Sequence, residues 1–148
     1  MLDRAGILAL IPHGGRSCLL DGLLDWSASG LRCLTRSHLD RANPLRRAGR
    51  LSPVCGAEYG LQAAALHGAL RGGGRQRAGY LVALRGVEIN TDRLDDPAHG
   101  EMVVEATLEA GDAAGTTYGF RLLSEAGAWL VRGRGTVSLG TVPPEPGP

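Results

Sequence analysis

The chain of 148 residues is 43% hydrophobic and 21% charged, which is typical of a single globular domain. Its formal net charge of +1 gives no general attraction to nucleic acid or to acidic membranes. The basic residues are all Arg, and the few aromatic residues are not interleaved with the Arg clusters, so the sequence predicts no nucleic-acid partner.

The cysteines are too few and too widely spaced to form a disulfide framework or a zinc site. They are Cys18, Cys33 and Cys55, without a CxxC motif or a Cys/His cluster. The apolar run at residues 7–11 is too short for a signal peptide, and polar residues interrupt the weakly charged stretch 51–70. We therefore predict a cytoplasmic protein with reduced thiols, no metal site and no membrane span.

Two short strands are predicted at the start of the fold. Residues 18–26 and 31–35 are rich in apolar side chains, and the turn-forming residues 27–30 separate them. Residues 37–52 fit neither a helical nor a strand period, so we expect a long loop there. Loops of this length inside a compact domain are often functional.

A helix follows the loop. Ser52 suits an N-cap and Pro53 suits the first turn, while the glycines at 72–74 end the pattern after about Leu70.

Four strand-like segments fill the second half of the chain, at residues 80–89, 101–110, 116–123 and 128–139. One apolar face of the second segment is formed by Met102, Val104, Ala106 and Leu108. In the last segment the alternation places Leu130 among the residues that face water. We expect a single domain over residues 1–142 and a flexible tail over the Pro/Gly-rich residues 143–148.

The predicted helix does not look like a surface helix. Between Arg50 and Arg71 the only formally charged side chain is Glu58, and Gly and Ala are frequent. Small residues allow a sheet to approach a helix axis closely. The sequence therefore predicts an α+β protein of the hot-dog type, in which a curved antiparallel sheet of five to six strands wraps a long central helix.

A lone carboxylate in such a helix is expected to have a raised pKa or a dedicated partner, because removing it from water is costly. Glu58 is therefore the main candidate for acid–base chemistry. Gln62 lies one turn further on the same face and could hydrogen-bond Glu58 or a substrate. The alternative is that Glu58 pairs with a loop residue such as Arg46 or Arg47 and has no other role.

Three segments, LIPHGGRSCLLDGLLDW, RSHLDRANPLRR and GAEYGLQAAALHGAL, resemble the 3-hydroxyacyl-acyl carrier protein dehydratases, particularly the branch associated with aryl polyene pigments. The resemblance covers roughly residues 8–139. It implies elimination of water from a 3-hydroxyacyl thioester on an acyl carrier protein, in fatty-acid-like or polyene biosynthesis, without a cofactor. It also implies a site built across a subunit interface, in a homodimer or in a heterodimer with a sister dehydratase.

The resemblance assigns the family's helix carboxylate to Glu58. The loop His of the family's HFPG sequence is absent, and Pro44 stands in its place, 14 residues before Glu58. The candidate bases are therefore His38, six residues earlier, and then His13. We expect His38 to remove the proton next to the carbonyl while protonated Glu58 delivers a proton to the departing hydroxyl.

The same family binds the thioester carbonyl with a backbone N–H at the start of the helix. Pro53 has no N–H, so the resemblance leaves three candidate donors, Val54, Cys55 and Gly56. Of the remaining histidines, His67 is expected to be a packing residue, and His99 has no assigned role.

Clusters of Arg flank the helix in an otherwise neutral chain. We predict that an acidic carrier protein and its phosphopantetheine phosphate contact Arg46, Arg47, Arg50 and Arg71. The alternative is that these residues only solvate loops.

Two other functions remain open. The chain could be a hot-dog acyl thioesterase, in which the carboxylate activates water against the thioester carbonyl. It could also be a catalytically weak partner subunit of a heterodimeric dehydratase, because the expected His is missing.

Overall fold

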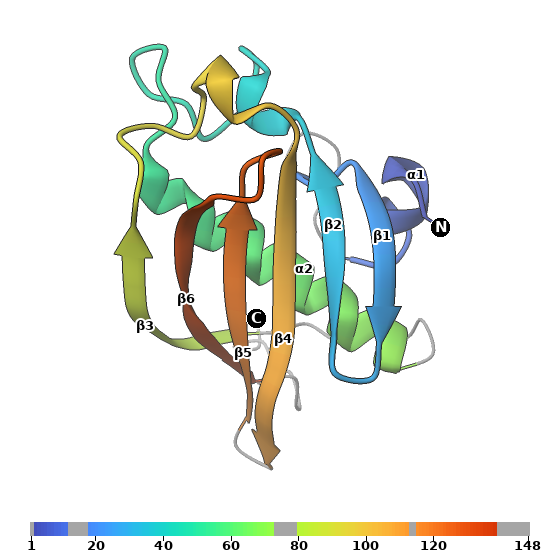
Figure 1. Ribbon diagram of the computed structural model, residues 1–148. Helices are drawn as coiled ribbons and strands as arrows, with labels where there is room; N and C mark the ends of the chain where they lie inside the picture. Colours follow the sequence, from blue (N-terminus) through green and yellow to red (C-terminus); the bar gives the residue numbers. More distant parts are fainter. Residues whose placement is uncertain (1, 12–17, 73–79, 113–114, 139–148) are drawn as a thin grey trace, which may run out of the picture.

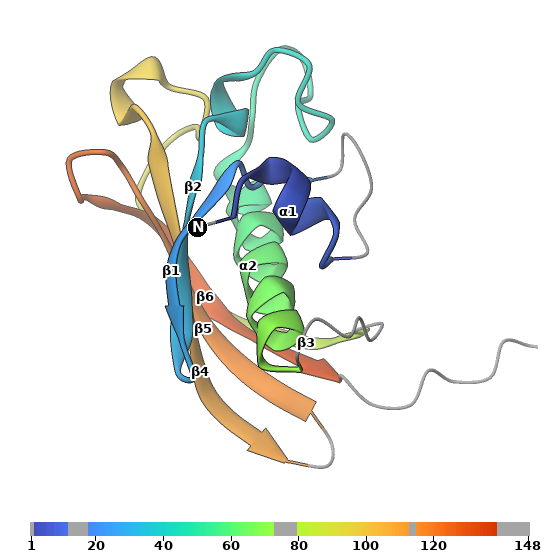
Figure 2. The same cartoon turned by 90° about the vertical axis from the view of Figure 1, so that its right-hand side faces the viewer.

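The computed structural model describes residues 2–11, 18–72, 80–112 and 115–138. In these residues a six-stranded antiparallel sheet, ordered β1-β2-β4-β5-β6-β3, curves around the helix α2 (Figure 1) (Figure 2). A short helix, α1, lies beside β1 at one edge of the sheet (Figure 1). The predicted α+β arrangement of a long helix against a curved antiparallel sheet is confirmed.

The elements lie close to their predicted positions. The helices are α1 (Arg4–Leu8) and α2 (Gly56–Arg71). The strands are β1 (Gly22–Ser27), β2 (Gly30–Thr35), β3 (Tyr80–Ile89), β4 (Met102–Asp112), β5 (Gly115–Leu123) and β6 (Trp129–Ser138). The predicted tail 143–148 lies outside the described residues, and no helix within them is both long and apolar enough to cross a membrane.

Close contact between α2 and the sheet depends on glycine. A Cβ placed on Gly60 would lie 2.3 Å from Cγ of Phe120, and one on Gly56 would lie 3.0 Å from Val131. Phe120 is 3% exposed and Val131 is fully buried. The small residues of the helix therefore let these two side chains of β5 and β6 fill the space directly above its axis.

The inner face of the sheet follows the predicted alternation in β4 but not everywhere in β6. Met102, Val104 and Ala106 are at most 1% exposed, as expected. Leu130, however, is 4% exposed although the alternation places it in water. Its prediction was wrong because β6 is irregular there, with Trp129 opposite Leu123 but Val131 opposite Leu122.

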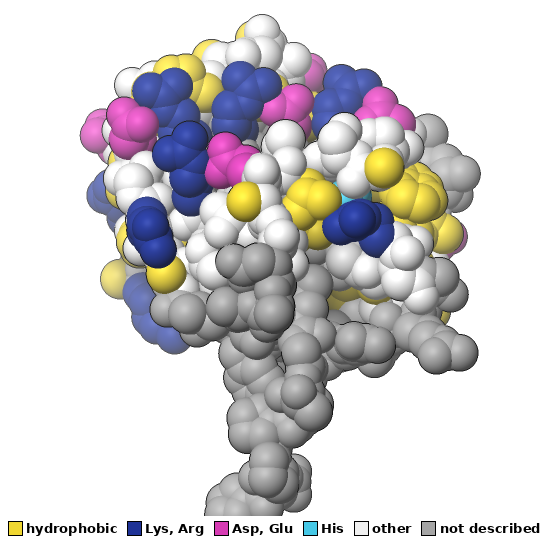
Figure 3. Space-filling view, turned by 90° about the horizontal axis from the view of Figure 1, so that it is seen from below, with side chains coloured by type: hydrophobic (Ala, Val, Ile, Leu, Met, Phe, Trp, Pro, Cys, Tyr) yellow, Lys and Arg dark blue, Asp and Glu magenta, His cyan; other side chains and the backbone are white. Residues whose placement is uncertain are grey.

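The outer face of the sheet carries a row of charges that crosses all six strands. From β1 to β3 the row consists of Asp25, Arg32, Glu105, Arg121, Arg132 and Glu88. Each carboxylate forms an ion pair with a neighbouring Arg of the row. Figure 3, which views the molecule from below, shows acidic and basic side chains intermingled along one margin. The outer face is therefore electrically balanced and suited to solvent.

Two local features differ from the expectation. The helix α1 was not predicted, and the Asp3 side chain caps it by accepting a 3.0 Å hydrogen bond from the Gly6 amide. At α2, a 3₁₀ turn over Pro53–Cys55 precedes the helix, and the Ser52 side chain makes no capping hydrogen bond. The predicted start of the helix was therefore right in place but wrong in its cap.

Candidate functional site

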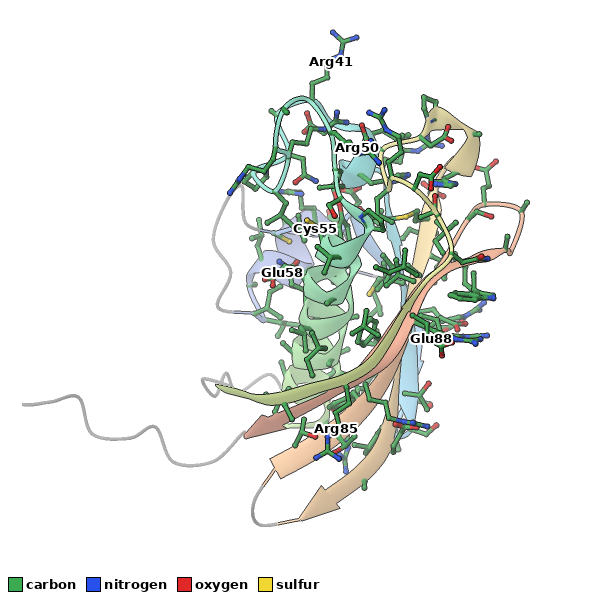
Figure 4. The ribbon with its side chains drawn as sticks, turned by 90° about the vertical axis from the view of Figure 1, so that its left-hand side faces the viewer. Arg41, Arg50, Cys55, Glu58, Arg85 and Glu88 are labelled. Atoms are coloured by element: carbon green, nitrogen blue, oxygen red, sulfur yellow. The ribbon has the colours of Figure 1, made fainter. Side chains whose placement is uncertain are left out.

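Four of the predicted site residues, Val54, Cys55, Gly56 and Glu58, lie at the N-terminal end of α2. Val54 and Cys55 belong to the 3₁₀ turn, and Glu58 lies in the first turn of the helix. Figure 4 shows Cys55 and Glu58 at this end of α2, with Glu58 on the side away from the sheet. The sheet and the loop 37–52 thus present these residues together at one end of the molecule.

Glu58 is half-buried rather than enclosed. Within the described residues its carboxylate forms no hydrogen bond or ion pair. The alternative partners are engaged elsewhere: Arg46 pairs with Asp95, and Arg47 donates to the backbone carbonyls of Pro44 and Arg46. Glu58 is therefore held on a rigid helix with its carboxylate available to an external group.

Only one of the three candidate amides remains free. The Cys55 N–H donates to the Ser52 carbonyl at 3.0 Å, and the Gly56 N–H donates within the 3₁₀ turn to the carbonyls of Pro53 and Val54. The Val54 N–H has no acceptor in the part of the chain that the structure describes, and Val54 as a whole residue is 57% exposed. The positive end of α2 therefore offers the Val54 amide to a ligand carbonyl.

Cys55 does not have the environment of a nucleophile. Burial raises the pKa of its thiol, and the nearby Arg47 guanidinium opposes this only in part. Its Sγ lies 3.9 Å from the Leu45 carbonyl oxygen. Cys55 therefore forms part of the wall between the loop and the helix start.

His38 is sealed inside the protein. Its side chain is 0% exposed, and its Nε2 lies 2.7 Å from the Gly100 carbonyl oxygen, so this nitrogen donates the proton. Burial lowers the pKa of His38 to about 4, against the opposing effect of the Gly100 bond. No hydrogen bond joins His38 to Glu58 among the described residues. Its role as the base stays a prediction, while His13 lies outside the described residues.

The other two described histidines are also engaged. His67 is fully buried, with Nδ1 2.8 Å from the Tyr118 hydroxyl and Nε2 2.8 Å from the Ser27 carbonyl, which fits its expected packing role. His99 contacts the Arg93 carbonyl at 3.0 Å through Nε2.

Gln62 faces the protein interior. It is 1% exposed, and its Oε1 accepts a 2.8 Å hydrogen bond from the Leu19 amide. The oxygen that was expected to meet Glu58 or a substrate is therefore committed to the backbone before β1.

A buried polar network next to the site was missed by sequence reasoning. The Tyr59 hydroxyl lies 2.8 Å from the Ser37 hydroxyl and accepts a 3.1 Å hydrogen bond from the side-chain Nδ2 of Asn43. Burial raises the pKa of Tyr59 to about 12, so the phenol stays neutral. The sequence signal was the position of Tyr59 next to Glu58 on a buried helix, but its loop partners could not be identified.

The predicted Arg contacts divide into three kinds. Arg46 has a side chain only 13% exposed and acts inside the loop. Arg47 and Arg50 are exposed, and Figure 4 shows Arg50 near the start of α2. Arg71 ends the 16-residue helix, about 24 Å away at 1.5 Å per residue. In the described residues no three His, Cys, Asp or Glu side chains are grouped so that they could hold a metal ion.

Comparisons with known proteins identify the family and the fold. A family model described as ApeP-like, ApeP dehydratase, matches residues 5–139. No curated protein sequence matches the chain.

Several solved structures are similar. A chain of the dehydratase heterocomplex ApeI:P from Xenorhabdus doucetiae has a TM-score of 0.77 at 17% identity, over 91% of both chains. AziG of S. sahachiroi has a TM-score of 0.62 at 14% identity, over 81% of this chain and 90% of that one. Thioesterase superfamily member 2 of Mus musculus has a TM-score of 0.58 at 17% identity, over 80% of each chain. These likenesses show the hot-dog fold.

Proposed function

The chain belongs to the ApeP-like dehydratase family, and from that premise we propose that it acts in eliminating water from a 3-hydroxyacyl thioester carried on an acyl carrier protein. The observation that supports this proposal is that the start of α2 holds two available groups, the carboxylate of Glu58 and the free backbone N–H of Val54. The pathway would be fatty-acid-like or polyene biosynthesis, and we place it in the cytoplasm.

The two groups suit two parts of one reaction. The thioester carbonyl would accept a hydrogen bond from the Val54 N–H, where the dipole of α2 also favours the negative charge of a developing enolate. A base removes the proton next to the carbonyl, and the carbon–oxygen bond of the 3-hydroxyl breaks as the double bond forms. Protonated Glu58 would donate its proton to the departing hydroxyl, which leaves as water.

The engagement of the described histidines favours an active site that is shared with another subunit. Each histidine in the described residues is either sealed or engaged by backbone and side-chain partners, namely His38, His67 and His99. The base would then come from His13 or from another subunit. This observation supports the second candidate function, a catalytically weak partner within a heterodimeric dehydratase.

The free edge of the sheet supports such a partner. β3 ends the sheet, and no described strand pairs with its outer edge. Leu84 and Ile89 on this strand are 40% and 47% exposed. The opposite edge is partly covered, because the Leu23 amide of β1 donates to the Leu2 carbonyl. We therefore propose that a second hot-dog subunit, identical or not, pairs along β3.

A carrier protein would approach the end of the molecule that holds Val54 and Glu58. Arg47 and Arg50 lie there without a carboxylate partner among the described residues. Their positive charges are therefore available to an acidic protein or a phosphate. Arg46 is already paired with Asp95, and Arg71 lies at the far end of α2. The proposed carrier contact is therefore narrowed to Arg47 and Arg50.

Mass spectrometry of the acyl carrier protein separates the candidate functions. The chain would be incubated with 3-hydroxyacyl carrier protein, alone and after co-expression with a sister hot-dog subunit. Loss of one water with the chain alone supports an independent dehydratase, and loss only in the mixture supports the partner role. Release of a free acid and a carrier thiol would instead identify a thioesterase.

A further inference from the structure

Asp95 is an ionic centre outside the candidate site. Its side chain is 2% exposed, and Oδ2 accepts hydrogen bonds from Arg46 Nη1 at 3.2 Å and from Arg93 Nη2 at 2.5 Å. Oδ1 accepts from Arg93 Nε at 2.9 Å and from the Leu51 amide at 3.0 Å. Such saturation is what a buried carboxylate requires, and it indicates a fixed position for each partner.

These contacts converge on the residue that leads into the helix. The Leu51 amide is held by Asp95, and the Leu51 carbonyl accepts a 3.0 Å hydrogen bond from the Leu94 amide. Leu51 itself is fully buried. Both backbone groups of Leu51 are therefore fixed to one short segment of chain, residues 94–95.

Through Arg46, Asp95 also holds the loop 37–52. Arg46 bonds Asp95 and also donates to the carbonyls of His38 at 3.1 Å and Gly49 at 3.2 Å. Removal of the carboxylate would leave a buried guanidinium without its counter-ion, which is strongly unfavourable. The loop and the helix entrance therefore depend on one carboxylate.

Leu51, which Asp95 holds, is close in sequence to the reacting groups. Val54 follows Leu51 by three residues, and Pro53 between them has its φ angle fixed by its ring. A rotation at Leu51 would thus turn the 3₁₀ turn and the Val54 amide relative to Glu58. None of the contacts of Asp95 involves Val54 or Glu58 directly.

We propose that Asp95 is a positioning residue, which sets the orientation of the Val54 amide and of the first turn of α2 by holding Leu51 and Arg46. The inference rests on the proposed dehydratase function for its kinetic consequence, but its structural part is independent of it. Displacement of a reacting group by about 1 Å reduces turnover on the order of a hundredfold.

The test compares Asp95→Ala with Asp95→Asn in the complex that dehydrates the carrier-bound substrate. Asp95→Ala should lower kcat on the order of tenfold or more with little change in KM, because binding surface is retained while alignment is lost. Asp95→Asn keeps an oxygen for the Leu51 amide and should recover part of kcat. The matched control is Glu105→Gln, which breaks an ion pair on the outer sheet face and should leave kcat and KM unchanged.

Amide hydrogen exchange gives the readout that does not depend on activity. In Asp95→Ala, exchange should rise in the peptide spanning residues 51–58 and stay unchanged in β4 and β5; if Asp95→Ala does not fold, the same comparison is made with Asp95→Asn. Unchanged exchange at 51–58, or an equal loss of protection throughout the chain, would overturn the positioning role. Failure of the wild-type complex to form an unsaturated product would overturn the proposed function alone.

Discussion

The side-chain oxygen of Gln62 accepts a 2.8 Å hydrogen bond from the amide of Leu19, 43 residues earlier in the chain. This contact ties the centre of α2 to the backbone that leads into β1. We expect Gln62→Leu to lower the free energy of unfolding by about 1–3 kcal/mol, because the buried Leu19 N–H would lose its acceptor. Urea unfolding measures the change. An unaltered midpoint would show that the contact is unimportant for stability.

The turn at residues 47–50 contains strain that can be removed. Ala48 has a φ of 53° and Gly49 a φ of 71°, and Arg47 and Arg50 exchange backbone hydrogen bonds of 2.8 and 3.1 Å. Asn tolerates this conformation better than Ala, and Asn-Gly is the preferred pair in such turns. We expect Ala48→Asn to raise the free energy of unfolding by about 0.5–1 kcal/mol.

The control for this prediction is Ala28→Asn. Ala28 is also exposed in a turn, but its φ is not positive. Its substitution should leave the free energy of unfolding unchanged. Equal effects of the two substitutions in chemical denaturation would contradict the assigned strain.

His38 should make stability fall in mild acid. Its pKa in the folded protein is about 4 because of burial, compared with 6.5 for the exposed side chain. The unfolded chain therefore binds more protons between these values, and the stability present above pH 6.5 is lost as the pH falls through 4. The loss attributable to His38 should reach about 3 kcal/mol at most.

Unfolding of His38→Gln at a series of pH values measures this contribution. The variant should show a shallower decline across the window than the unsubstituted protein. His67, whose pKa is also lowered by burial, provides the comparison through His67→Gln. An unchanged slope in His38→Gln would contradict the assignment of His38 as a sealed neutral side chain.

The carrier contact should be confined to one end of the molecule. We expect Arg47→Glu or Arg50→Glu to raise KM for carrier-bound substrate several-fold at low salt, with a smaller effect at high salt. The same variants should leave KM for a pantetheine thioester unchanged. Arg71→Glu, at the other end of α2, should change neither value; a rise in KM with that variant would place the carrier elsewhere.

Local patterns predicted most of the fold. The absence of charge and the small residues of the helix predicted that a sheet packs closely against it. The structure shows this close contact where Phe120 approaches Gly60. The strand period failed at Leu130, because the pairing of β6 with β5 skips this residue, with Trp129 opposite Leu123 and Val131 opposite Leu122. No periodic signal marks such an irregularity. The short helix α1 depends on an Asp3 cap and was missed for lack of a longer pattern.

The site was predictable only where it lies on one element. Glu58 and Val54 share the helix start, so their proximity follows from the sequence alone. His38 is hydrogen-bonded in the interior to the Gly100 carbonyl, 62 residues away. The Leu51 amide is bound by Asp95, 44 residues away. Contacts of this range require the folded chain, which is why the burial of His38 was not predicted.

We propose that the Glu58 carboxyl group takes part in dehydration. The most direct measurement is the rate of unsaturated-thioester formation by Glu58→Gln in the active complex, with Glu109→Gln on the outer sheet face as the control. We predict that Glu58→Gln lowers kcat on the order of a hundredfold or more while Glu109→Gln does not. Full turnover by a folded Glu58→Gln complex would contradict the claim.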